Sequence, residues 1–231
     1  MTPLLRKSLR ALFGYDPAYC DMYLDEEESF FAKLYLQAME HGFASSGNGS
    51  SLTLLDAGCQ AGRLAIPLAK KGHHIVGVDT SRFALRRARH HSRSAGVEVR
   101  WVRGDILRVL PKFPRGFFNG ILCIEVLYLR RNFRTILTAF HETLRQQGLL
   151  MVSHRPPAYY LKLAMEKNDA ETARFIQSHH EGELWGSYFN WQVPSELEIL
   201  YQSLGFTVQE IRPIERSTQE PHYLLVVAHK N

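Results

Sequence analysis

The sequence predicts an α/β protein built on a doubly wound, mostly parallel sheet, and two observations carry this prediction. Between residues 50 and 154, apolar runs of strand length alternate with amphipathic segments of helix length, the pattern of successive βαβ units. The first apolar run enters a glycine-containing turn, and the next run ends in an acid, Asp79, about 20 residues after the first glycine. Strand, glycine turn, helix, strand and acid in this order predict a site for a ligand that contains a nucleoside.

The segment that precedes the sheet is expected to be helical. Acids occupy its first turn from Glu26, and apolar residues up to Met39 recur on one side of a helix. Residues 44–51, rich in serine and glycine, then form a loop that leads into the first strand. The helices predicted within the core lie at residues 61–71, 81–95 and 131–146.

The pattern changes after the fifth predicted strand. Pro156 and Pro157 stop that strand, and a single helix is expected over residues 161–177. An aromatic cluster follows, formed by Trp185, Tyr188, Phe189 and Trp191.

The last part of the chain predicts a helix and two strands. The helix starts at Pro194 and ends at Gly205, and the strands are expected at 206–211 and 222–228. We therefore predict one domain over residues 1–231, with an N-terminal helical appendage at 1–50 and an insertion at 155–192.

The glycine turn has the sequence Asp56-x-Gly58-x-Gln60-x-Gly62. A nicotinamide or flavin site would instead have G-x-G-x-x-G, with a pyrophosphate at the helix N-terminus. An acid ahead of the first glycine suits a cofactor without phosphate and with a cationic amino acid end. The turn resembles the first motif of class I S-adenosylmethionine-dependent methyltransferases. Further segments resemble later motifs of that family in the same order, at residues 99–106, 117–128 and 144–153.

This resemblance covers residues 50–154. It implies a Rossmann-like methyltransferase fold with seven strands and an antiparallel hairpin at the sheet edge, S-adenosyl-L-methionine as cofactor, and a substrate lid at 155–192. In the family pattern, Asp79 contacts the ribose, and Asp105 with the next backbone amide meets the adenine. The cofactor-binding residues that the resemblance implies are Asp56, Gly58, Cys59, Gln60, Gly62, Asp79, Thr80, Asp105, Ile106 and Glu125.

Gln60 is a departure from the family pattern, because it stands where the middle glycine is usual. A side chain is thereby placed where the backbone should approach the ligand or adopt a positive φ. The substitution is either a tolerated variation or the mark of a weakened or lost cofactor site.

Methyl transfer by in-line displacement requires a placed nucleophile, exclusion of water and, for some acceptors, removal of a proton. His154 is a candidate base at the carboxyl edge of the sheet, or else an exposed or backbone-bonded residue at a strand end. Tyr128 is a candidate to bind the acceptor, or else packs beside the cofactor. Glu125 either holds an amine or caps the loop that follows.

Composition excludes several classes of protein. Hydrophobic residues make up 45% of the chain, which excludes wholesale disorder, and no apolar run approaches the ~20 residues of a membrane helix. Cys20, Cys59 and Cys123 lack C-x-x-C spacing, and His179-His180 has no second cluster, so neither a disulfide framework nor a metal site is predicted. The N-terminus lacks the apolar region of a secretory signal, so we expect a cytoplasmic protein that does not bind membranes.

The net charge of +5 makes nucleic acid an alternative partner. The predicted helix 81–95 carries Arg82, Arg86, Arg87, Arg89 and Arg93. A solvated helix face also explains these arginines, and no appended RNA-binding module is visible.

Three functions follow from the sequence. The first is methyl transfer to an oxygen or nitrogen of a small-molecule acceptor, with the lid aromatics favouring an aromatic or amphipathic one. The second is an RNA or protein methyltransferase that uses the arginine-rich face, and the third is a non-catalytic binding protein with this fold. The acceptor and the oligomeric state are not predicted.

Overall fold

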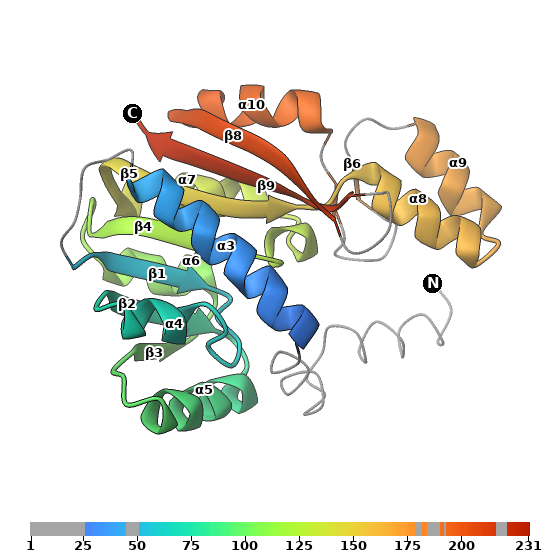
Figure 1. Ribbon diagram of the computed structural model, residues 1–231. Coiled ribbons are helices and arrows are strands. Elements are labelled where there is room, and N and C mark those ends of the chain that lie inside the picture. Colours follow the sequence, from blue (N-terminus) through green and yellow to red (C-terminus); the bar gives the residue numbers. More distant parts are fainter. Residues whose placement is uncertain (1–25, 45–50, 179–181, 184–189, 192, 216–220) are drawn as a thin grey trace.

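A sheet of seven strands, in the order β3-β2-β1-β4-β5-β9-β8, forms the centre of the molecule (Figure 1). The computed structural model describes residues 26–44, 51–178, 182–183, 190–191, 193–215 and 221–231. The strands of the sheet are β1 (Thr53–Ala57), β2 (His74–Asp79), β3 (Arg100–Arg103), β4 (Phe118–Cys123), β5 (Leu144–His154), β8 (Phe206–Glu215) and β9 (Pro221–Lys230). Pairing is parallel from β3 through β5, and β9 is antiparallel to both β5 and β8. The predicted fold class is therefore confirmed.

Helices cover both faces of this sheet (Figure 1). They are α3 (Glu26–Ala44), α4 (Ala65–Lys70), α5 (Arg82–Ser94), α6 (Ile106–Val109), α7 (Phe133–Thr143), α8 (Pro157–Glu166), α9 (Ala170–Ser178) and α10 (Pro194–Ser203). Short 3-10 turns lie at η1 (Leu110–Lys112) and η2 (Leu127–Leu129), and β6 (Gly182–Glu183) pairs with β7 (Asn190–Trp191) in a separate small sheet.

The core has two apolar layers because neighbouring residues of a strand point to opposite faces of a sheet. Leu54 of β1 joins the layer beneath α3, α4 and α8, whereas Leu55 joins the layer beneath α6, α7 and α10. Both leucines are fully buried. The apolar runs of the sequence are thus strands covered on both sides, as a parallel sheet requires.

Helix α3 confirms the helix predicted before the sheet and extends it to Ala44. A Cβ added at Gly120 of β4 would lie 2.6 Å from the Phe43 ring and 3.0 Å from Leu54, so these side chains fill the space above the glycine. A Cβ at Gly42 would similarly lie 2.8 Å from Leu149 of β5. The described part of the N-terminal appendage is therefore packed onto the sheet.

The prediction of one helix over residues 161–177 is wrong, since the segment forms α8 and α9 with a break between them. Asn168 at the break has a φ of 53°, which ends a right-handed helix. The Asp169 side chain then caps α9, because it accepts the Thr172 N–H at 3.0 Å and the Thr172 hydroxyl at 2.7 Å. Apolar periodicity continued across this break and concealed it.

Two boundaries also differ from the sequence prediction. Helix α7 ends at Thr143, not near 146, because β5 begins at Leu144 and bulges between its pairings with Phe118 and Gly120 of β4. The last two strands are longer than expected, at ten residues each.

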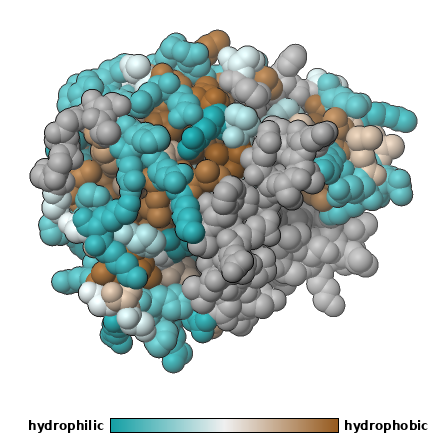
Figure 2. Space-filling model, in the orientation of Figure 1, coloured by the Kyte–Doolittle hydropathy of each residue, from teal (hydrophilic) through white to brown (hydrophobic). Residues whose placement is uncertain are grey.

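Several predicted features lie outside the described residues, namely residues 1–25 of the appendage, Cys20, the His179-His180 pair and the aromatic side chains of Trp185, Tyr188 and Phe189. Within the described residues, none of the helices has the length and apolar character needed to cross a membrane. Hydrophilic residues cover much of the described surface in the view of Figure 2.

Candidate active site

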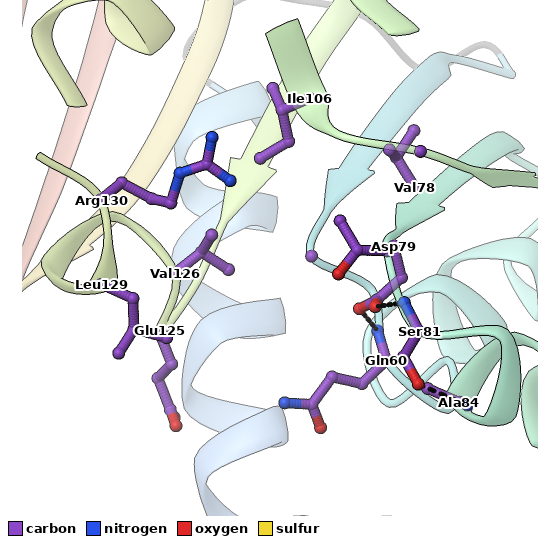
Figure 3. Close-up of a pocket in the computed structure, with 13 residues that line it drawn as sticks. Gln60, Val78, Asp79, Ser81, Ala84, Ile106, Glu125, Val126, Leu129 and Arg130 are labelled. Atoms are coloured by element: carbon purple, nitrogen blue, oxygen red, sulfur yellow. Dashed lines mark hydrogen bonds between the residues drawn. The ribbon is translucent and has the colours of Figure 1, made fainter. Parts of the chain in front are cut away.

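A pocket of about 270 Å³ opens at the carboxyl ends of β1, β2 and β4 (Figure 3). This edge is where open α/β sheets bind ligands, because the strand order reverses there and the loops diverge. The residues that line the pocket are Gly58, Gln60, Val78, Asp79, Thr80, Ser81, Ala84, Gly104, Ile106, Glu125, Val126, Leu129 and Arg130.

Gly58 starts the turn after β1 and needs to be glycine for two reasons. Its φ is 88°, a conformation that side chains disfavour, and an added Cβ would lie 2.2 Å from Cγ2 of Val126. Its N–H and that of Cys59 both donate to the Val78 carbonyl, at 2.7 and 3.0 Å. These two bonds fix the turn to the end of β2. The backbone at Gly58 therefore lies close to Val126, in the loop after β4.

Asp79 ties the glycine turn to helix α5. Its Oδ2 accepts the Gln60 N–H at 2.9 Å, and its Oδ1 accepts the Ser81 N–H at 2.7 Å (Figure 3). Ser81 in turn caps α5 by accepting the Ala84 N–H at 3.1 Å. Burial raises the pKa of Asp79, and the backbone N–H bonds oppose that shift. A carboxylate fixed in this way has further lone pairs for ligand hydroxyls.

Gln60 adopts a φ of 44°, so a glutamine occupies the left-handed conformation that the usual glycine would take. Its side chain lines the pocket, and its Oε1 is shielded from solvent without a hydrogen-bond partner among the described residues. The sequence predicted the strained position but not the direction of the side chain.

Asp105 lies beside the pocket and not in its lining. Its Oδ1 caps α6 by accepting the Leu107 N–H at 3.0 Å, and its Oδ2 accepts a hydrogen bond from Arg130 at 2.7 Å. Ile106, the next residue, does line the pocket. Arg130 therefore already engages the carboxylate that was expected to meet the adenine.

The loop after β4 presents Glu125 to the pocket with a φ of 62°. The Glu125 N–H donates to Oγ of Ser153 at 2.6 Å, which fixes the loop to β5. Its carboxylate pairs with Arg63 at 3.3 Å, and both side chains are largely buried. Asp56 lies behind the turn, 4% exposed, and burial raises its pKa to about 7 although Arg63 opposes the shift.

His154 does not project from the sheet edge, and the structure corrects that expectation. Strand β5 includes His154 and pairs it with Leu224 of β9, so the residue lies inside the sheet. Its side chain is 0% exposed, and its Nε2 lies 2.8 Å from the Tyr201 hydroxyl of α10. The pocket lining does not include His154, so we do not propose this residue as the base.

Tyr128 is also buried and absent from the pocket lining. It belongs to a cluster that sequence reasoning missed, in which the Arg155 guanidinium lies over the rings of Tyr159 at 3.6 Å, Tyr223 at 4.0 Å and Tyr128 at 4.8 Å. Arg155 also donates to the Tyr223 hydroxyl at 2.5 Å. The only local signal was a basic residue at the end of a strand before two tyrosines.

The structure brings some of the predicted cofactor residues together around the pocket, namely Gly58, Gln60, Asp79, Thr80, Ile106 and Glu125. The other predicted cofactor residues are absent from the lining, and they are Asp56, Cys59, Gly62 and Asp105. The sequence did not single out Val126, Leu129 and Arg130, although they lie within five residues after Glu125 in the segment that follows β4. Among the described residues, no group of three His, Cys, Asp or Glu side chains is placed to hold a metal ion.

Comparison with known proteins connects this pocket to a family. Residues 54–148 match a family model described as a methyltransferase domain. The ubiquinone biosynthesis O-methyltransferase of Pseudomonas paraeruginosa is 24% identical over 184 residues, which cover 75% of this chain and 72% of the relative. That of Ralstonia nicotianae is 27% identical over 174 residues, which cover 74% of this chain and 70% of the relative.

Solved structures show the same fold. The 1,6-didemethyltoxoflavin-N1-methyltransferase of Burkholderia thailandensis, with 1,6-didemethyltoxoflavin and S-adenosylhomocysteine bound, aligns with a TM-score of 0.68 at 21% identity, over 100% of this chain and 91% of that chain. The magnesium protoporphyrin IX methyltransferase of Synechocystis, with bound S-adenosylhomocysteine, aligns with a TM-score of 0.66 at 15% identity, over 99% and 95%. Sequence motifs, sheet order and the match of residues 54–148 to a methyltransferase domain agree, and the chain has the fold of the class I S-adenosylmethionine-dependent methyltransferases, which its motifs resemble.

Proposed function

We propose that the protein transfers the methyl group of S-adenosylmethionine to an oxygen or nitrogen of a small-molecule acceptor. The observation that carries the proposal is the pocket at the carboxyl ends of β1, β2 and β4, where Asp79 is held by the glycine turn and by α5. The names of the sequence relatives, which are O-methyltransferases, favour oxygen.

The residues of the pocket fit the cofactor chemically. The Asp79 carboxylate has lone pairs beyond its two backbone N–H bonds, which suit the ribose hydroxyls. Val78, Ala84 and Ile106 offer apolar walls for the adenine. Glu125 adds a carboxylate to the lining, and a carboxylate suits the cationic amino acid end.

In this proposal, the protein catalyses transfer mainly by holding the cofactor and the acceptor in position. The cofactor supplies a methyl group that its sulfonium already activates. The chain binds the two reactants at a fixed separation and keeps water from them, and such positioning can supply a large part of the rate enhancement. Because His154 is buried against Tyr201, we assign no general base, and acceptors that lose their proton readily should react best.

We place the acceptor beneath the lid, residues 155–192, which begins at the carboxyl end of β5. The described part of the lid supports an aromatic or amphipathic acceptor, since Tyr159 and Tyr160 stack edge to face where α8 begins. In this proposal the chain is a single domain with an N-terminal appendage at 1–50, and it works in the cytoplasm.

Titration calorimetry with S-adenosylhomocysteine tests the cofactor site without an acceptor, and micromolar binding is expected. Incubation with S-adenosylmethionine and panels of phenols, hydroxylated amphiphiles and amines then tests transfer. Mass spectrometry should detect a gain of one methyl group on a small molecule. Binding of the cofactor with transfer only to RNA or protein would contradict the proposal.

An RNA methyltransferase remains a second candidate because of α5. Arg82, Arg86, Arg89 and Arg93 are all exposed on this helix, so their charges are available to phosphates. The test is binding of RNA to the protein at increasing salt. A steep loss of affinity with salt, reduced by Arg86→Gln and Arg93→Gln, would support it.

A further inference from the structure

We infer that the side-chain carboxamide of Gln60 is a ligand of the cofactor, with its Oε1 accepting a hydrogen bond from the α-ammonium group of the amino acid end. The glycine usual at this position has no side chain for that contact. The inference rests on the ribose position proposed above at Asp79, and it does not depend on the acceptor.

The backbone of Gln60 is held in place before any ligand arrives. Its N–H donates to Asp79 at 2.9 Å, and its φ of 44° is one that a glutamine adopts only under constraint. Strained backbone that surrounding contacts maintain is characteristic of ligand sites. A substitution that was merely tolerated would leave the side chain free to turn into solvent.

Gln60 is half-buried, and its side-chain oxygen is the part withdrawn from solvent. Its Oε1 is shielded from water, and no hydrogen-bond donor within the described residues reaches it. Figure 3 shows the carboxamide extending away from Asp79 toward the side of the pocket where Glu125 lies, with its nitrogen on the Glu125 side. A shielded acceptor without a donor is unfavourable, and a bound ligand with N–H groups would satisfy it.

The position of Gln60 indicates which hydrogen-bond donor of the cofactor would lie beside it. Asp79 and the start of α5 lie on the ribose side, and Ala84 and Ile106 line the proposed adenine side. The remaining side, toward Glu125, would hold the amino acid end, whose donors belong to its α-ammonium group. A hydrogen bond from a charged donor is stronger than a neutral one.

The neutrality of glutamine also fits this site. Asp56 and Asp79 are already desolvated acids close to the turn, and the charge of Asp79 adds to the burial that raises the pKa of Asp56. A carboxylate at position 60 would add a third negative charge, whereas an amide adds only an acceptor.

The test compares two ligands that share the nucleoside and differ in the amino acid end. S-adenosylhomocysteine carries that end, and 5′-methylthioadenosine lacks it. Calorimetry on Gln60→Met, which keeps the length of the side chain and removes the amide, should show about tenfold weaker S-adenosylhomocysteine binding. Binding of 5′-methylthioadenosine should not change.

The chain offers a matched control in Gln147, an exposed glutamine with a φ of 58° in the bulge of β5. Gln147→Met makes the same chemical change at the same backbone conformation outside the pocket, so both affinities should be kept. Gln60→Gly relieves the backbone strain and should still lose the preference for S-adenosylhomocysteine. Thermal unfolding of each variant establishes that it is folded.

Each outcome is decisive. Equal weakening for the two ligands would place Gln60 at the nucleoside and overturn the inference, as would unchanged affinity for both. Failure of the acceptor proposal is distinguishable, because it would appear as normal cofactor binding without methyl transfer to small molecules.

Discussion

Replacing Asp79 by alanine removes the group that joins three parts of the pocket. Its carboxylate accepts the N–H of Gln60 in the glycine turn at 2.9 Å and the N–H of Ser81 before α5 at 2.7 Å. In the proposed complex its free lone pairs also accept the ribose hydroxyls. The substitution therefore acts on the cofactor directly and on the shape of the turn.

The expected magnitude follows from these contacts. Hydrogen bonds to a charged acceptor contribute roughly 1–3 kcal/mol to binding, so S-adenosylhomocysteine should bind about 5- to 150-fold more weakly. The free energy of unfolding should fall less, by about 1 kcal/mol, because water can reach the two N–H groups in a half-buried site. Burial raises the pKa of Asp79, so losing the carboxylate also relieves a desolvation cost.

Titration calorimetry measures the affinity, and urea unfolding measures the stability. Asp169→Ala is the matched control, since Asp169 also caps a helix through two hydrogen bonds to Thr172 but lies outside the pocket lining. The control should bind the cofactor normally. If Asp79→Ala kept the wild-type affinity, the ribose assignment would be refuted.

Three further predictions concern other positions. Burial raises the pKa of Asp56 to about 7 from 3.8, so the folded state binds the proton more tightly and the stability due to this group falls as pH rises through 7. Asp56→Asn should therefore raise the free energy of unfolding by at most roughly 4 kcal/mol near pH ~8 and have little effect near pH ~4, as urea unfolding at the two pH values would measure. Gly58→Ala should cost about 2–4 kcal/mol in urea unfolding because its Cβ meets Val126, whereas Gly72→Ala, at a φ of 87° with no atom within 4 Å, should cost only about 1 kcal/mol. Arg155→Met should lower the unfolding free energy by about 1–3 kcal/mol through lost cation–π contacts, and calorimetry should show unchanged cofactor affinity.

Local sequence was sufficient to predict the elements that build the cofactor pocket. The spacing from Gly58 to Asp79 is fixed by one strand, one turn and one helix, all of which have local signals. The alternation of strands and helices then leaves few possible sheet orders, because parallel crossovers are right-handed. The carboxyl edge, and with it the pocket, follows from topology alone.

Contacts between distant parts of the chain were not predictable in this way. His154 bonds to Tyr201, 47 residues away, and Arg155 bonds to Tyr223, 68 residues away. Their burial depends on β9 and α10, which pack beside β5 only after the whole sheet has formed. A polar residue at a strand end therefore has no local signal that separates a core position from a site position.

Gln60 and Glu125 share a property that explains why sequence rules fail at the centre of the site. Each is a non-glycine residue with a positive φ, and each lines the pocket, one after β1 and the other after β4. Propensity alone would place glycine at both positions, since a side chain there costs free energy in the empty protein. Each is also held by a hydrogen bond from its own N–H, to Asp79 and Ser153 respectively. The fold thus maintains two strained residues that present an amide and a carboxylate to the same cavity, and a cationic ligand end between them would offset the cost. On this argument, replacing both by glycine should raise the stability of the free protein while weakening its affinity for S-adenosylhomocysteine.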